Sequence, residues 1–178
     1  ERGIPITLEL GGKSPNIIFA DAAIDQAVEG IVRGIYFNQG HVCCAGSRLF
    51  VEEGIREEVI SKLRFRMASL RVGDPLDKNT DVGAINSRAQ LETINSYCEA
   101  GVAEGAVLEE PGGQALPERG FWRRPCFFTG VRESHRIARE EIFGPVLAVM
   151  TFRTPAEAVA RANNTPYGLS AGVWTEKG

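Results

Sequence analysis

The chain has 178 residues, of which 20 are Lys or Arg and 23 are Asp or Glu, so its net charge is −3. This length fits about one domain with a substantial core. A near-balanced charge without a basic cluster argues against a nucleic-acid partner, and the sequence has no apolar run of the ~18 residues that a membrane span needs. We therefore expect a globular protein that binds neither nucleic acid nor membrane.

The ends of the chain and its cysteines indicate where the protein works. The chain does not begin with Met, ends abruptly at Trp174–Gly178, and has no apolar signal segment after its first three residues. We expect it to be cut from a longer protein. The four cysteines lack the C-x-x-C spacing of zinc sites. They are Cys43, Cys44, Cys98 and Cys126. The expectation is reduced thiols, no metal site and a cytoplasmic location.

The alternation of apolar and polar residues predicts a first strand over 6–10, which carries Glu9 and ends at Gly11 and Gly12. The pattern then predicts strands over 15–20, 48–52, 107–109, 126–128, 146–152 and 169–174. It predicts helices over 23–36, 54–70, 87–106 and 155–162, with loops at 73–83 and 110–120. Because strands alternate with helices, the sequence predicts an α/β fold with a mainly parallel, twisted sheet flanked by helices.

Two short segments carry residues suited to covalent catalysis. Thr7–Pro15 places Glu9 before a pair of glycines, and Phe37–Arg48 places Cys43 in a turn of small residues. A thiol can attack a carbonyl carbon, and a carboxylate can then activate the water that releases the acyl group. Each residue alone also fits an ordinary role, Cys43 as a buried core thiol and Glu9 as a solvated strand residue. The neighbouring Cys44 is interpreted as a core residue.

Two further motifs allow more than one interpretation. Glu140–Pro145 could present a carboxylate to sugar hydroxyls and an aromatic ring to a flat ligand, or it could be a charged helix end before a turn. Gly12-Lys13-Ser14 matches the end of a phosphate-binding P-loop, but Thr7 stands where that loop needs its first glycine. Pro15 also removes a backbone donor. We therefore do not expect a nucleoside triphosphate site.

Together with Asn163–Ala171, these segments resemble the NAD(P)-dependent aldehyde dehydrogenase superfamily. The four blocks occur in family order, and the resemblance covers nearly the whole chain. It implies an aldehyde substrate that is oxidised to a carboxylic acid through a thiohemiacetal and a thioester on the cysteine. The implied roles are nucleophile for Cys43, general base for Glu9, ribose-binding carboxylate for Glu141, ring beside the nicotinamide for Phe143, and backbone border of the nicotinamide for Leu10.

The resemblance has consequences for the whole protein. It implies that residues 1–178 are a catalytic domain, without the cofactor-binding domain and a C-terminal segment. The implied cofactor is NAD or NADP, with most of its site outside this chain, and the intact protein is expected to be a homo-oligomer. The isolated chain is expected to be inactive as a dehydrogenase. His41 stands where many members have glutamine, which bears on substrate preference and on the pKa of the thiol.

Two other functions stay open at this point. The chain could be a non-catalytic, aldehyde-dehydrogenase-like module used for assembly or regulation. It could also be a thiol hydrolase or acyltransferase that needs no nicotinamide, although the ribose-binding motif at Glu141 would then have no obvious purpose.

Overall fold

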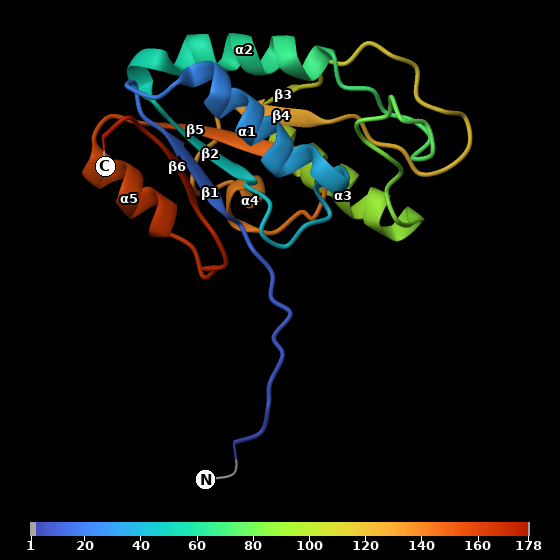
Figure 1. The fold of residues 1–178 in the computed structure, drawn as a ribbon, viewed down its shortest axis with the longest axis horizontal. Coiled ribbons are helices and arrows are strands. Elements are labelled where there is room, and N and C mark those ends of the chain that lie inside the picture. The colour runs from blue at the N-terminus through green and yellow to red at the C-terminus, as the bar shows by residue number, and fades with distance from the viewer. Residues whose placement is uncertain (1–2, 178) are drawn as a thin grey trace.

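The computed structural model describes residues 3–177 and has a six-stranded sheet at its centre, in the order β3-β4-β5-β2-β1-β6 (Figure 1). The strands are β1 (Pro15–Ile18), β2 (Arg48–Glu52), β3 (Val107–Glu109), β4 (Cys126–Thr129), β5 (Val146–Phe152) and β6 (Gly172–Trp174). Neighbouring strands are parallel except for the antiparallel pair β3 and β4. The predicted mainly parallel sheet is confirmed.

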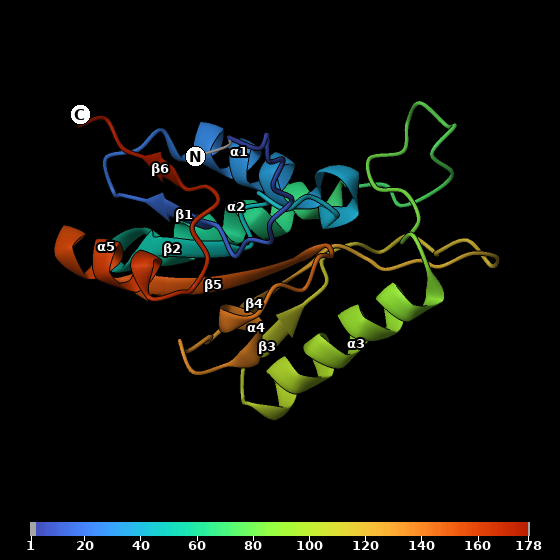
Figure 2. The same cartoon turned by 90° about the horizontal axis from the view of Figure 1, so that it is seen from below.

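Helices cover both faces of this sheet (Figure 2). They are α1 (Ile24–Tyr36), α2 (Arg56–Ala68), α3 (Arg88–Ala103), α4 (Arg136–Arg139) and α5 (Pro155–Asn163), with 3₁₀ turns η1 (Phe37–Gly40) and η2 (Glu53–Ile55). Successive strand residues point to opposite faces. Leu49 and Val51 therefore join the core with α1 and α2, whereas Phe50 joins the core with α3, α4 and α5. Burial on both faces explains the continuous apolar sequence of the central strands.

Local sequence signals account for the start of two helices. The hydroxyl of Ser87 accepts a hydrogen bond from the Gln90 amide and begins α3, and Thr154 caps α5 in the same way. The predicted helices agree with the structure to within a few residues. Helix α4 was not predicted, because its four residues are too few to show a helical period. Within residues 3–177 no helix has both the length and the apolar character required to cross a bilayer.

The predicted strand over 6–10 is wrong. Residues 3–11 are exposed and form an extended arm that leaves the body of the molecule (Figure 1). The apolar residues that alternate along this arm, Ile4, Ile6, Leu8 and Leu10, are all more than half exposed. An alternating pattern becomes a strand only when a neighbouring strand supplies backbone partners and one face is covered. No strand of the described residues lies beside the arm.

Candidate active site

The four sequence blocks meet because each one precedes a parallel strand. Thr7–Pro15 leads into β1, Phe37–Arg48 into β2, Glu140–Pro145 into β5 and Asn163–Ala171 into β6. Pairing sets Arg48 opposite both Pro15 and Ala148, and Gly172 opposite Asn16. In a parallel arrangement all amino ends lie along one edge of the sheet. The candidate site is therefore at the amino ends of β1, β2, β5 and β6.

Cys43 lies in the turn between η1 and β2. Its side chain is partly exposed, whereas Cys44 is exposed and Ala45 and Gly46 are buried. The interpretation of Cys44 as a core residue is therefore wrong, because the turn directs that side chain outward. Cys43 is therefore not sealed inside the core, although the small residues that follow it in the turn are buried. All four cysteines are free thiols in this structure.

Gly12 links the cysteine turn to the Glu140–Pro145 block. Its amide donates a 3.1 Å hydrogen bond to Oε1 of Glu141. A Cβ atom at Gly12 would lie 2.3 Å from the carbonyl oxygen of Cys43, and one at Gly11 would lie 2.3 Å from Oε2 of Glu141. At Gly12 only glycine allows the close approach, because the obstacle is backbone, whereas at Gly11 it is the end of the Glu141 side chain. The backbone of Cys43 and the carboxylate of Glu141 therefore both lie in close contact with the segment Gly11–Gly12.

Phe143 is placed by a second tight contact. It has a positive φ of 55°, and its ring stacks on the imidazole of His41 at a centroid distance of 5.4 Å and an interplanar angle of 9°. Gly40, with φ of +72°, brings its Cα so near Gly144 that a Cβ would lie 2.2 Å from that carbonyl oxygen. Phe143 remains 37% exposed. The stack therefore presents part of an aromatic ring beside the cysteine turn, and burial lowers the pKa of His41.

Two side chains that the sequence analysis did not single out tie the turn to β6. Ser170 lies 2.9 Å from the hydroxyl of Ser14 and donates a 3.1 Å hydrogen bond to the carbonyl of Cys44. The side chain of Asn16 fills the space between two glycines, since a Cβ at Gly46 or Gly172 would overlap it. No local sequence pattern marks these two residues. The contacts of Ser170 are with residues more than 120 positions away along the chain, and those of Asn16 arise from the packing of neighbouring strands.

Lys13 and Arg48 form a buried cationic pair behind the turn. Arg48 donates to the carbonyl of Lys13 at 2.7 Å and to that of Ala162 at 2.8 Å. Lys13 is 1% exposed, and its ammonium has no hydrogen-bond partner among the described residues. Burial, aided by the charge of Arg48 and opposed by Glu141, lowers the pKa of Lys13 to about 7. Burial also lowers the pKa of Arg48, to about 10.

Glu9 and Leu10 lie on the arm, just before the two glycines. Both are exposed, and Leu10 keeps 56% of its surface accessible. The structure thus brings Cys43, Glu141 and Phe143 into one region. Glu9 and Leu10 lie outside it, on the exposed arm that joins this region at Gly11 and Gly12.

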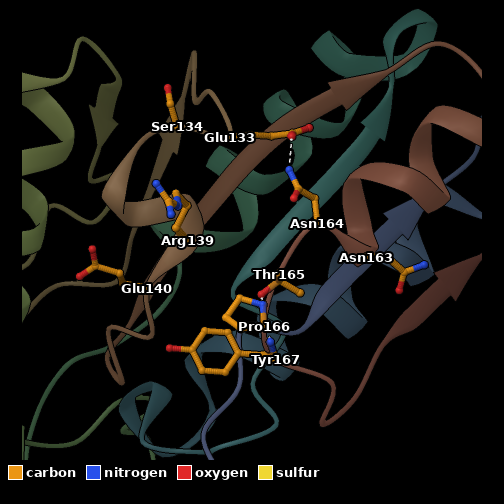
Figure 3. A pocket seen from close by; sticks show the side chains of 9 residues that line it. All are labelled: Glu133, Ser134, Arg139, Glu140, Asn163, Asn164, Thr165, Pro166 and Tyr167. Atoms are coloured by element: carbon orange, nitrogen blue, oxygen red, sulfur yellow. Dashed lines mark hydrogen bonds between the residues drawn. The ribbon is translucent and has the colours of Figure 1, made fainter.

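The hollow beside the cysteine turn is small. It is lined by Gly12, Val42, Glu141 and Phe143 among others, and its volume is about 10 Å³. A larger open cleft of about 780 Å³ is lined by Arg139 and Glu140 and by Asn164 and Tyr167 (Figure 3). There Asn164 donates a 2.8 Å hydrogen bond to Glu133. The larger cleft contains no thiol, so it is not where Cys43 would act.

The arrangement of the site suits thiol chemistry beside a carboxylate that a backbone amide orients. A partly exposed sulfur, backbone amides of a tight turn, a carboxylate oriented by a backbone donor and a partly exposed ring lie on neighbouring loops. A carboxylate of this kind can accept hydrogen bonds from ribose hydroxyls, and an aromatic ring can pack against a flat heterocycle. These features fit a nicotinamide nucleotide, with Glu141 and Phe143 as the residues that would hold it.

Comparison with known proteins identifies the same family that the sequence motifs resemble. The profile of the Aldehyde dehydrogenase family matches residues 1–178. Human retinal dehydrogenase 2 is 49% identical over 170 residues, which are 96% of this chain and 33% of that protein. Betaine aldehyde dehydrogenase of Brucella anthropi is 45% identical over 175 residues, 96% of this chain and 36% of that protein.

Solved structures agree with the sequence relatives. An NAD-dependent aldehyde dehydrogenase from Sinorhizobium meliloti superimposes with a TM-score of 0.90 at 48% identity, covering 94% of this chain and 33% of that one. A mutant indole-3-acetaldehyde dehydrogenase of P. syringae, in complex with NAD+ and IAA, gives a TM-score of 0.90 at 48% identity, covering 94% and 34%. The chain spans about a third of the length of these proteins. By fold, by sequence and by the four converging blocks, the chain belongs to the aldehyde dehydrogenase family.

Proposed function

We propose that this chain is the catalytic domain of an NAD(P)-dependent aldehyde dehydrogenase, with Cys43 as the nucleophile. The observation that carries the proposal is the position of Cys43: a partly exposed thiol in a tight turn, joined through Gly12 to the carboxylate of Glu141. Relatives that bind NAD+ in their solved structures support a nicotinamide dinucleotide as the cofactor. No described residue is assigned to the 2′ position of the adenosine ribose, so the proposal covers NAD and NADP as a class.

The first proposed step forms a bond between Cys43 and the substrate. The thiolate attacks the aldehyde carbon, the C=O π electrons move to oxygen, and a thiohemiacetal results. The backbone amide of Cys43 is the proposed donor to this oxygen, because donors fixed in a turn need no reorganisation as charge develops. NAD(P)+, when bound, accepts the hydride that converts the thiohemiacetal into a thioester.

The second proposed step releases the acid. Glu9 takes a proton from a water molecule, the resulting hydroxide attacks the thioester carbon, and the carbon–sulfur bond breaks to restore the Cys43 thiolate. The arm that carries Glu9 continues into Gly11 and Gly12, and the lack of a side chain at Gly12 permits a close approach to the carbonyl of Cys43. Leu10, between the base and these glycines, is the proposed backbone border of the nicotinamide. Glu141 would hold the ribose of the bound cofactor, and Phe143 would pack against its nicotinamide ring.

The experiment that tests the proposal compares two adjacent cysteines in the full-length protein. Cys43→Ala should lower NAD(P)-dependent aldehyde oxidation by several orders of magnitude, because loss of the nucleophile removes the covalent route. The matched control is Cys44→Ala, which removes an exposed thiol one residue away and should leave the rate nearly unchanged. Unchanged oxidation in the Cys43 variant would favour a non-catalytic module. Cys43-dependent ester hydrolysis indifferent to NAD(P) would favour a thiol hydrolase.

The remaining features of the whole protein are also proposals. We expect a homo-oligomer that acts on a small-molecule aldehyde in the cytoplasm, which is supported by four free cysteines and by the substrates named for the relatives. The isolated chain should not reduce NAD(P), because a partial cofactor site cannot hold the reacting atoms in attack geometry.

A further inference from the structure

A second pair of thiols lies away from the cysteine turn. Cys98 is in the middle of α3 and is 4% exposed, and Cys126 begins β4 and is fully buried. Both belong to the core on the α3 side of the sheet, which Cys43 does not join. None of the chemistry proposed above uses them.

A single guanidinium group donates hydrogen bonds to both sulfur atoms. Nη2 of Arg123 donates to Sγ of Cys98 at 3.5 Å and to Sγ of Cys126 at 3.7 Å. Arg123 also forms an ion pair with Glu110, and its Nε atom is buried without a hydrogen-bond partner among the described residues. The side chain of Arg123 is 18% exposed, whereas both thiols are buried.

The environment distinguishes the two thiols. Hydrogen bonding from Cys126, together with the charge of Arg123, lowers the pKa of Cys98. The same thiol–thiol hydrogen bond and burial raise the pKa of Cys126. A thiolate beside a guanidinium is the form that reacts with oxidants, and a neutral thiol that shares the same guanidinium is suited to attack the oxidised sulfur. Cys98 is thus suited to react first and Cys126 to resolve the product.

Two plainer roles explain this cluster less well. Cysteines that only filled core space would need no cationic donor, and placing a guanidinium against an apolar core costs free energy. A metal site would need further ligands, and residues 3–177 contain no cluster of three or more His, Cys, Asp or Glu side chains able to hold an ion. Two thiols that share one guanidinium donor are the arrangement of an oxidisable dithiol.

We propose that Cys98 and Cys126 form a reversible disulfide when the protein meets a hydroperoxide such as hydrogen peroxide. The bond would join α3 to β4. Helix α3 also supports the candidate active site, because Gln90 donates to the carbonyls of Ile142 and Phe143. Oxidation would therefore fix a helix that contacts the loop of Glu141 and Phe143.

The chemistry balances with peroxide as the only oxidant. The Cys98 thiolate attacks one peroxide oxygen, the O–O bond breaks, and hydroxide leaves as water with the proton that Cys98 gave up. Cys126 then attacks the sulfenic sulfur, the S–S bond forms, and the hydroxyl group leaves as water with the Cys126 proton. Overall the two thiols lose two electrons and two protons, and peroxide becomes two molecules of water.

The test identifies the bond by mass spectrometry of the full-length protein after peroxide treatment, alkylation of the remaining thiols and digestion with trypsin. The sequence places Cys98 on the peptide 89–119, Cys126 on 124–132, and both Cys43 and Cys44 on 34–48. A link between Cys98 and Cys126 therefore joins two peptides that no reaction of Cys43 with Cys44 could join. We expect this linked species to appear with peroxide and to disappear with dithiothreitol.

Matched variants test the role of the cation. Arg123→Gln should slow formation of the linked species by about tenfold, because the thiolate loses its charged donor. Arg124→Gln should not, because Arg124 instead donates to the carbonyl of Gln114. The proposal is overturned if peroxide leaves Cys98 and Cys126 alkylatable while the peptide 34–48 is oxidised. Equal rates in the two arginine variants would overturn the assignment to Arg123. The wild-type measurement decides the main question even if a variant fails to fold.

Discussion

Replacement of Gly12 by alanine tests whether the backbone contact behind Cys43 positions the nucleophile. The added Cβ would lie 2.3 Å from the carbonyl oxygen of Cys43. Ordinary non-bonded contacts between carbon atoms have an optimum at about 3.5–4.0 Å, so the two segments must separate by about 1 Å or more. The obstacle is backbone rather than the end of a flexible side chain. The turn that carries the sulfur must therefore move, or the Gly12 segment must.

The expected magnitude has two parts. Forcing an extra methyl group into a close-packed site costs about 1–3 kcal/mol of folding free energy. A displacement of about 1 Å at a reacting group lowers the rate by about 100-fold. The same shift would stretch the 3.1 Å hydrogen bond between the Gly12 amide and Glu141, which adds a loss of cofactor affinity. We therefore expect Gly12→Ala to lower kcat/KM by about 100-fold, with a smaller relative effect on stability.

Two other glycines provide matched controls. A Cβ at Gly11 would lie 2.3 Å from Oε2 of Glu141, the far end of a side chain that can rotate away, so Gly11→Ala should have a milder effect. A Cβ at Gly34, inside α1, has no heavy atom within 4 Å. Gly34→Ala should therefore stabilise the protein by about 0.5–1 kcal/mol through helix propensity.

The assay combines steady-state aldehyde oxidation, urea unfolding and the rate at which iodoacetamide alkylates Cys43. The order of activities should be Gly34→Ala, then Gly11→Ala, then Gly12→Ala. If Gly12→Ala oxidised aldehyde within about twofold of the wild-type rate and unfolded at the same urea concentration, the contact would not position the turn. The reasoning from packing would then be refuted.

Two further predictions concern Lys13 and Glu9. The pKa of Lys13 falls from 10.5 to about 7 on folding, so between these values the unfolded chain binds more protons and wild-type stability rises with pH. At ~1.4 kcal/mol per pKa unit, Lys13→Met should stabilise the protein by up to about 5 kcal/mol below pH 7 and should abolish that slope. Equal urea midpoints at about pH 6 and 9 in the wild type would contradict this prediction. Glu9→Gln should slow steady-state turnover by about 10²–10⁴-fold while a stopped-flow burst of reduced nicotinamide remains. Loss of the burst together with turnover would show that Glu9 does not act in thioester hydrolysis.

Much of the fold could be predicted from sequence because its signals are local. The periodicity of α1 and α2, the hydroxyl of Thr154 before α5 and the apolar run of β5 each fix an element within a few residues. The same local signal failed for 6–10, where alternation exists without a neighbouring strand. Cys44 was misplaced because a turn, unlike a strand or helix, has no period that tells inward from outward.

The sequence by itself determined the α/β class, the identity of four motif blocks and the types of reactive group in them. Only the tertiary structure decided that these blocks meet at the amino ends of parallel strands β1, β2, β5 and β6, since strand order and register depend on contacts between distant residues. It also decided that Ser170 holds the carbonyl of Cys44, and that Arg123 joins Cys98 to Cys126. These contacts follow from close packing of segments far apart along the chain, which no local pattern encodes.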